Sequence, residues 1–111
     1  YKVMDSLWGL GQMSATKVIV VFDGDVDVQN MDEVLFHLGN NIDPLRDVVI
    51  KKGPMDILDH ASLEEGFGGK MGIDATKKLR QEGMTRPWPE RAVMDGETIR
   101  KVDGIWKTLG L

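Results

Sequence analysis

The chain has 111 residues, a net charge of −4 and no cysteine. This length predicts a single domain, and the lack of cysteine excludes a disulfide framework and a cysteine-based metal site. The acidic balance argues against nucleic acid as a partner, because phosphate binding needs a surplus of Lys and Arg. No apolar run approaches the ~18 residues that cross a membrane, and no signal peptide is visible. We therefore expect a cytoplasmic protein.

The first residues predict a short helix that runs into a loop near Ser14. Met4, Leu7 and Trp8 follow helical spacing, and glycines at 9 and 11 then weaken the helix by about 1 kcal/mol each relative to Ala. The sequence leaves two interpretations of this apolar stripe open. Either it packs on the sheet of this domain, or it is exposed and faces a partner.

Residues 17–22 predict the first strand, because a run of β-branched and aromatic residues without alternation is typical of a strand covered on both faces. Asp23, Asp25 and Asp27 follow it. Their spacing resembles the start of a calcium-binding loop, but that loop also needs Gly at its sixth position and Glu at its twelfth, and both are missing. We therefore expect Asp23 and Asp25 to accept hydrogen bonds from backbone amides at the end of the strand.

Residues 31–40 predict an amphipathic helix, with Asn30 as its N-cap and Glu33 at the capping-box position. Its apolar stripe consists of Met31, Val34, Leu35 and Leu38. His37 lies among apolar neighbours with no second His at ligand spacing, which indicates a residue at the edge of the core and not a metal ligand.

A second apolar strand is predicted at 47–51, so strand, helix and strand follow one another as a βαβ unit with parallel strands. A third strand is predicted at 71–76, an irregular segment at 77–94, and a C-terminal helix at 96–109 with a stripe of Ile99, Val102, Trp106 and Leu109. The fold class is therefore α/β: a small, mainly parallel sheet built on a βαβ unit, with flanking helices and a C-terminal helix.

The stretch 53–77 is rich in glycine and in polar side chains, which favours a recognition loop. The Walker pattern fails in it, because Glu64 and Met71 stand where Gly and Ser or Thr are required. The dinucleotide fingerprint fails as well. What remains is a predicted Gly-rich loop of Gly68, Gly69 and Lys70, in which the Lys is able to meet an anion.

Five segments carry a resemblance to one enzyme family. They are Pro-Met-Asp-Ile-Leu-Asp-His-Ala-Ser at 54–62, Gly-Gly-Lys-Met-Gly-Ile-Asp-Ala-Thr-Lys at 68–77, Ile-Val-Val-Phe-Asp-Gly-Asp-Val-Asp-Val at 19–28, Asp-Pro-Leu-Arg-Asp-Val-Val at 43–49, and Ile-Trp at 105–106. In this order they closely resemble the C-terminal part of the UbiD family of decarboxylases. The resemblance implies that the chain is the C-terminal domain, residues 1–111, of a longer enzyme whose flavin-binding part lies upstream.

For that parent enzyme the resemblance implies non-oxidative decarboxylation of an aromatic, 4-hydroxybenzoate-like acid in quinone biosynthesis, with prenylated FMN, Mn²⁺ and K⁺. The catalytic Glu-Arg-Glu set of the family matches no position here, so we expect no catalytic residue, no metal ligand, no bound cofactor and no activity in this chain alone. Its expected partners are the upstream domains, further copies of the enzyme and the substrate. The resemblance also allows a peripheral association of the parent with a membrane.

The family's substrate cleft is approached by the segment after the second strand. Carried over to this chain, that segment contains Pro54, Met55, Asp56 and Leu58. We expect Met55 to form the apolar wall, since a flexible thioether adapts to different aromatic rings.

Two other functions compete with the decarboxylase reading. A protein-interaction module for oligomerisation is indicated by Trp8 and Trp106, because aromatic residues are enriched at interfaces. A free-standing nucleotide-binding domain rests on the βαβ pattern alone, and its phosphate motifs fail.

Overall fold

The structure is a computed structural model that describes residues 1–106, 108 and 109. Its helices are α1 (Lys2–Trp8), α2 (Met31–Asn40), α3 (Pro44–Asp47) and α4 (Gly96–Trp106), its 3₁₀ helices are η1 (Gly11–Ala15) and η2 (Arg80–Glu82), and its strands are β1 (Val18–Val21), β2 (Val48–Pro54) and β3 (Phe67–Asp74). The α/β class, the flanking helices and the C-terminal helix are therefore confirmed. None of these helices is long and apolar enough to cross a membrane.

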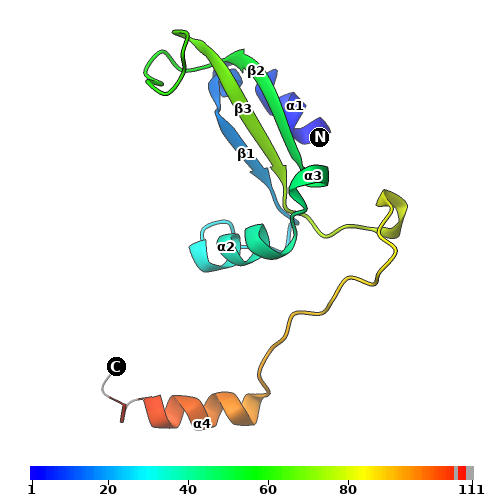
Figure 1. Cartoon of the computed structure of the whole chain (residues 1–111). Helices are drawn as coiled ribbons and strands as arrows, with labels where there is room; N and C mark the ends of the chain where they lie inside the picture. The colour runs from blue at the N-terminus through cyan, green and yellow to red at the C-terminus, as the bar shows by residue number, and fades with distance from the viewer. Residues whose placement is uncertain (107, 110–111) are drawn as a thin grey trace.

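The three strands form one sheet in the order β1-β3-β2 (Figure 1). β3 pairs in parallel with β1 and antiparallel with β2. The predicted βαβ unit is thus wrong, because 17–22 and 47–51 are not neighbours and the sheet is mixed. The physical reason is that β2 pairs with β3, the strand that follows it in sequence, as sequential strands usually do. This pairing places β3 between β1 and β2.

One face of the sheet, the inner sheet face, is covered by α1 and η1. It carries Ile19 of β1, Val49 of β2 and Gly72 of β3, which are cross-strand partners. Met4 is almost fully buried there, and the position of a Cβ on Gly72 would lie 2.6 Å from the Met4 sulfur. The indole N–H of Trp8 donates to the carbonyl of Thr16 at 3.0 Å. Of the two interpretations left open by the sequence, the α1 stripe therefore packs on its own sheet.

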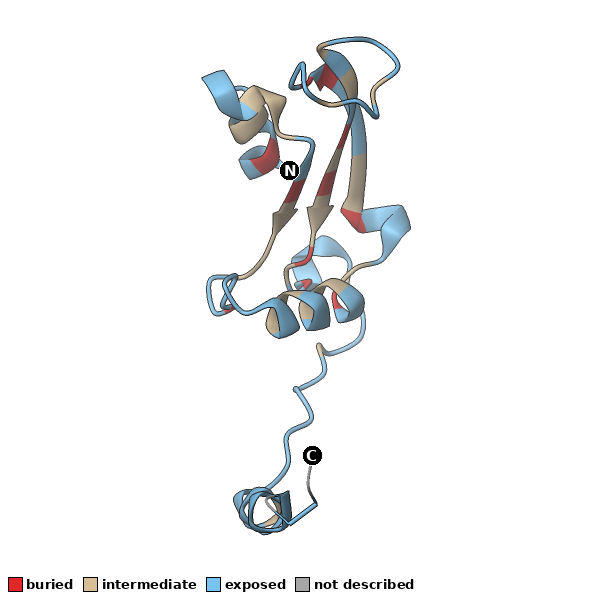
Figure 2. Cartoon of the chain, turned by 90° about the vertical axis from the view of Figure 1, so that its left-hand side faces the viewer, coloured by how far each residue is buried: buried red, intermediate tan, exposed pale blue. Residues whose placement is uncertain are grey.

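The opposite face, the outer sheet face, consists of two cross-strand rows of apolar side chains. The rows are Val18–Met71–Ile50 and Val20–Ile73–Val48. Ile50 is 68% exposed and Val18 is also exposed, so most of the first row faces solvent. The buried apolar residues among those described are few: Met4, Ile19, Val26, Met55 and Ala75. The core is small, and Figure 2 shows how few of the described residues are buried.

Helix α2 begins and ends as the sequence predicts. The side chain of Asn30 accepts the backbone N–H groups of Asp32 at 3.1 Å and Glu33 at 3.4 Å. The Glu33 carboxylate does not close a capping box. It accepts the N–H of Asp27 at 3.1 Å and thereby ties the preceding turn to the helix. The short helix α3 was not predicted, although Asp43 caps it through the N–H of Leu45 at 3.1 Å.

Helix α4 stands apart from the rest of the chain. Residues 83–95, which we call the arm, contain no helix or strand and lead α4 past α2 and away from the sheet (Figure 1). The radius of gyration is 19.3 Å, against about 13 Å for a compact domain of 100 residues. Pro87 and Pro89 restrict the backbone to extended conformations, which explains why the arm does not coil up.

Candidate substrate cleft

The loop of residues 55–66 connects β2 to β3 and shapes one end of the sheet. The N–H of Met55 donates to the carbonyl of Gly66 at 2.9 Å, which closes the loop at its base. The Asp56 carboxylate accepts the N–H of Leu58 at 2.9 Å, and the Asp59 carboxylate accepts the N–H of Ala61 at 3.0 Å. These side-chain bonds to nearby backbone are typical of Asp in turns, so the loop is held locally in a defined shape.

An ion pair fastens this loop to the first strand. Lys17, which directly precedes β1, lies 2.7 Å from a carboxylate oxygen of Asp59. The hydrogen bond from Lys17 holds the pKa of the Asp59 carboxyl below its usual value. The pairing joins two segments that are 42 residues apart in sequence, and it fixes the loop against the sheet.

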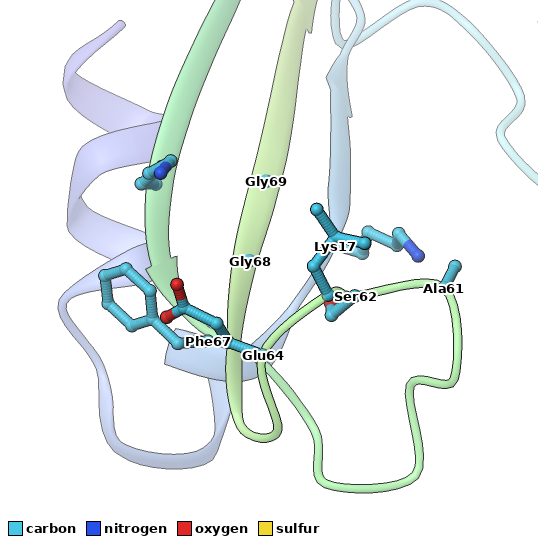
Figure 3. Close-up of a pocket in the computed structure, with 9 residues that line it drawn as sticks. Lys17, Ala61, Ser62, Glu64, Phe67, Gly68 and Gly69 are labelled. Carbon is cyan, nitrogen blue, oxygen red and sulfur yellow. The ribbon is translucent and has the colours of Figure 1, made fainter.

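A cavity of about 360 Å³ lies between the loop and the sheet. Its lining consists of Lys17, Lys52, Ala61, Ser62, Leu63, Glu64, Phe67, Gly68 and Gly69. In Figure 3, Gly68 and Gly69 form the floor on β3, with Lys17, Ala61 and Ser62 to one side and Glu64 and Phe67 to the other. The lining combines two lysines, of which Lys17 is paired with Asp59, with the Glu64 carboxylate and the Phe67 ring. Lys52 and Phe67 suit a ligand with an anionic group on an apolar body.

Of the two glycines of the floor, only Gly68 is required by packing. A Cβ on Gly68 would lie 2.4 Å from the Ser62 hydroxyl and 3.2 Å from Met55 Cγ, so a side chain there would displace the loop. At Gly69, by contrast, no atom lies within 4 Å of the position that a Cβ would take. Gly68 and Gly69 belong to β3 and pair with Gly53 and Lys52 of β2. The prediction of a Gly-rich loop is therefore wrong: the segment is the central strand.

Lys70, the third member of that predicted loop, is not free to meet an anion. It is only 4% exposed, and its ammonium donates to the carbonyls of Ser14 and of Thr16, the latter at 3.2 Å. Burial lowers the pKa of Lys70. Lys70 therefore binds η1 to the inner sheet face, and its aliphatic chain crosses Gly53, where a Cβ would lie 2.9 Å from Lys70 Cε.

The structure separates the four predicted cleft residues. Met55 is only 5% exposed and packs beneath the loop, whereas Leu58 is 82% exposed and Asp56 is exposed beside it. None of these three lines the 360 Å³ cavity. Pro54 lines a second cavity of about 330 Å³ on the inner side, together with Trp8, Lys51 and Lys70 among others.

Sequence reasoning named Gly68 and Gly69 among the residues that line the cavity, but it missed the charged and aromatic ones. Lys17, Lys52 and Phe67 come from three different strands or their flanks, and only the order β1-β3-β2 brings them together. No local pattern marks them. The pairing of β2 with β3 was the missing information, and residues 48–54 and 67–74 would have needed recognition as a hairpin.

A buried polar cluster lies at the opposite end of the sheet, and no local sequence pattern indicates it. The Asp47 carboxylate is 2% exposed and accepts the Arg46 guanidinium at 2.7 and 2.8 Å and the N–H of Asp43 at 2.8 Å. Lys78 is also buried. Its ammonium lies 3.1 Å from the Asp74 carboxylate and 3.7 Å from that of Asp47.

Burial alone would raise the pKa of both carboxyls in this cluster. For Asp47 the hydrogen bonds from Arg46 and from the backbone outweigh burial, and the pKa is lowered. For Asp74 the hydrogen bonds from Thr76 and the charge of Lys78 have the same result. Every buried polar side-chain atom in the described residues has a hydrogen-bond partner. The cluster is therefore structural: it holds the segment that follows β3 to the end of that strand.

The acidic run after β1 behaves as expected in part. Asp23 accepts the N–H of Lys77 at 2.8 Å, whereas Asp25 binds the Lys77 ammonium at 2.8 Å instead of a backbone amide. Among the residues that the structure describes, no group of three His, Cys, Asp or Glu side chains is arranged to hold a metal ion. The described residues therefore offer no such ligand group for the Mn²⁺ that the family resemblance implies.

The fold defines a small α/β domain, and comparison with known proteins identifies its family. Residues 1–75 match the family model of the 3-octaprenyl-4-hydroxybenzoate carboxy-lyase C-terminal domain. A relative from Aquifex aeolicus, described as an uncharacterized protein, is 56% identical over 111 residues, which are 100% of this chain and 23% of the relative. The chain therefore belongs to the UbiD family, and it spans about a quarter of the length of the relatives it matches.

Solved structures of this family share the fold. The closed form of Sedimentibacter hydroxybenzoicus vanillic acid decarboxylase has a TM-score of 0.78 at 28% identity and covers 96% of this chain and 23% of its own. The UbiD-class enzyme HmfF from Pelotomaculum thermopropionicum, in complex with FMN, has a TM-score of 0.62 at 32% identity and covers 81% of this chain and 20% of its own. The resemblance drawn from the five sequence segments is confirmed.

Proposed function

We propose that this chain is the C-terminal substrate-cleft and oligomerisation domain of a prenylated-flavin-dependent decarboxylase that removes CO₂ from an aromatic, 4-hydroxybenzoate-like acid. The observation that carries the proposal is the match to the family along the chain, together with a cavity whose lining suits an aromatic carboxylate. A relative that shares the fold over 96% of the chain is a vanillic acid decarboxylase, whose name identifies such an acid.

The division of labour in the parent enzyme follows from what this chain contains. When bound, the prenylated flavin supplies the electron sink for loss of CO₂. The described residues form no metal cluster, so upstream domains would hold the flavin with its Mn²⁺ and K⁺. A complex of HmfF with FMN supports a flavin in this class of enzyme. The isolated chain would accordingly be inactive, and the parent would act in the cytoplasm in ubiquinone or menaquinone synthesis.

Of the predicted segment, Asp56 and Leu58 would face the cleft in the parent, whereas Pro54 lies on the inner side of the sheet. Leu58 presents its side chain outward, and Asp56 holds its backbone through the bond to the Leu58 N–H. Met55 supports the loop from below, against Gly68. Apolar contact by Leu58 would exclude water beside the substrate ring, while Lys52 would raise the local concentration of a carboxylate.

The test compares the isolated chain with the parent enzyme. Each is supplied with prenylated FMN, Mn²⁺, K⁺ and 4-hydroxybenzoate, and CO₂ release is measured. We expect release by the parent only. Release by the isolated chain would refute its assignment as an incomplete part, and failure of the parent on a panel of aromatic acids would refute the substrate class.

A second function, an interaction module without any part in catalysis, is favoured by the exposed stripe of α4 and by the outer sheet face. Variants of the cavity residues Lys17 and Lys52 in the parent separate the two functions. Unchanged kcat/KM in a folded Lys52→Ala parent, together with a strict dependence of oligomer mass on α4, would favour the interaction module.

A further inference from the structure

Another cavity lies between helix α2 and the arm, at the end of the sheet away from the 55–66 loop (Figure 1). Its volume is about 470 Å³, within the range of roughly 300–1,000 Å³ that small-molecule sites occupy. Helix α2 contributes His37 and Asn41 to the lining, and the arm contributes Arg86, Trp88 and Arg91. None of the residues that line this arm cavity lines the candidate substrate cleft.

The two walls of the arm cavity are held together by Arg91. Its guanidinium carbon lies 4.6 Å from the centre of the Phe36 ring, a distance typical of a cation–π contact. The same guanidinium group lies 3.3 Å from the Glu33 carboxylate. Both contacts run from the arm to neighbouring turns of α2, so the cavity is already formed before any ligand binds.

His37 brings an N–H donor to the α2 wall. The side-chain amide nitrogen of Asn41 donates to the carbonyl of Ala75 at 2.9 Å, and it lies 3.3 Å from His37 Nδ1. A backbone carbonyl only accepts, so the amide presents its NH₂ group here and donates to Nδ1 as well. The proton of the neutral imidazole is then on Nε2. Within the described residues no hydrogen bond uses this Nε2–H group.

Arg86 gives the arm wall a cation that is able to bind an anion. Among the ion pairs of the described residues, Arg91 has a partner but Arg86 has none. The planar guanidinium matches a carboxylate in a two-point hydrogen bond. Trp88 is half-buried in the same wall and offers a flat apolar surface. The Glu90 carboxylate also lines the cavity, so a singly charged anion is favoured over a multiply charged one.

We propose that the arm cavity binds a small aromatic carboxylate. Arg86 and the Nε2–H of His37 would donate to the carboxylate, and the indole of Trp88 would cover the aromatic ring. This site goes beyond the proposed function, because it lies outside the candidate substrate cleft. A bound acid would contact both walls and so hold the arm more firmly to α2.

The tryptophans allow binding to be located by NMR. The chain has three of them, so a nitrogen-labelled sample gives three indole N–H signals, and a Trp88→Phe chain identifies the signal of Trp88. Titration with benzoate should shift this signal until it saturates. Benzyl alcohol has the ring without the charge, and inorganic phosphate has the charge without the ring. Each should bind at least about ten-fold more weakly than benzoate, because a charge-assisted hydrogen bond or a covered ring is lost. Equal affinity for either one would overturn the proposal.

Arg86→Ala tests the cation. Arg86 is exposed, so the fold should tolerate the substitution, which circular dichroism checks. We expect the dissociation constant for benzoate to rise at least about ten-fold. Arg80→Ala is the matched control, since Arg80 is an exposed arginine that does not line the cavity, and it should bind as the unmodified chain does. An unchanged dissociation constant in a folded Arg86→Ala chain would contradict the proposal.

Lys52→Ala separates this site from the candidate substrate cleft, where benzoate resembles the proposed substrate. The benzoate-induced shift of the Trp88 signal should be the same in the Lys52→Ala chain. Its loss there would show that benzoate acts through the cleft and would overturn the proposal. None of these measurements uses CO₂ release by the parent, so a failure here is distinguishable from a failure of the decarboxylase assignment.

Discussion

Met4 packs so closely on Gly72 that its sulfur lies where a side chain on Gly72 would begin. A Cβ on Gly72 would lie 2.6 Å from Met4 Sδ and 2.9 Å from Val49 Cγ1. This contact seats α1 on the inner sheet face and buries Met4. A glycine in a strand often marks such a close approach, and here it lies in the middle of the central strand.

Substitution of Gly72 by Ala should therefore destabilise the domain. We expect a loss of about 1–3 kcal/mol of unfolding free energy, the usual range for overpacking a core, with a changed environment of Trp8. Urea unfolding followed by tryptophan fluorescence measures it. Gly69→Ala is the matched control, because nothing lies within 4 Å of its Cβ position. Equal effects of the two substitutions would contradict the packing argument.

Acid should destabilise the fold through the buried cluster. The pKa values of Asp47 and Asp74 are lowered in the folded state, so the folded protein binds fewer protons than the unfolded chain. The stabilisation is complete above the unfolded value of about 4 and is lost as the pH falls below it. Chemical denaturation between pH 7 and pH 3 should show this decline.

The variant Asp47→Asn should be less stable at pH 7 by about 1–3 kcal/mol, because hydrogen bonds of a buried charged group are lost. Its stability should also depend less on pH below 4. Asp103→Asn, on the exposed helix α4, is the control and should reproduce the unmodified curve. A variant at Asp47 that keeps both the stability and the pH dependence would show that the cluster is not the acid-sensitive joint.

Removal of residues 97–111 should separate folding from association. The structure shows α4 apart from the sheet (Figure 1), so we expect the melting temperature of the remaining sheet to stay within a few degrees while the mass falls to that of a monomer. Circular dichroism and light scattering measure the two. Collapse of the fold would mean that α4 packs on its own sheet.

The wall of the cleft can be tested in the parent enzyme. Leu58→Trp should narrow the cleft and lower kcat/KM for bulky relative to small aromatic acids by about 10- to 200-fold, which corresponds to ~1–3 kcal/mol of discrimination. The exposure of Leu58 makes the fold tolerant of this change. An unchanged ratio in a folded, flavin-loaded variant would place Leu58 away from the substrate.

Substitution of Met55 should affect the stability of the domain and not its substrate discrimination. We first expected this side chain to form the wall itself, but it is buried beneath the loop and touches the floor at Gly68. Met55→Ala should therefore cost about 2–5 kcal/mol of stability, as for other large core residues. Loss of substrate discrimination without loss of stability would restore Met55 to the wall.

The sequence by itself determined the features that depend on neighbouring residues. Asn30 and the apolar spacing after it specify α2, because a cap and a helical stripe are local signals. The helical pattern after Asp95 specifies α4 in the same way, and the Asp95 carboxylate accepts the N–H groups of Glu97 and Thr98. The family was also readable, since five segments match it in order.

Only the tertiary structure decided the features that depend on distant residues. The glycines of β3 resemble a loop locally, but they permit α1 and the 55–66 loop to pack against a central strand. Their immediate sequence neighbours give no reason to expect Lys70 and Lys78 to be buried. Lys70 nevertheless donates to backbone carbonyls at η1 and its C-cap, and Lys78 pairs with Asp74 and Asp47. Strand order and the burial of a charge are set by pairing across dozens of residues, and no local periodicity encodes that pairing.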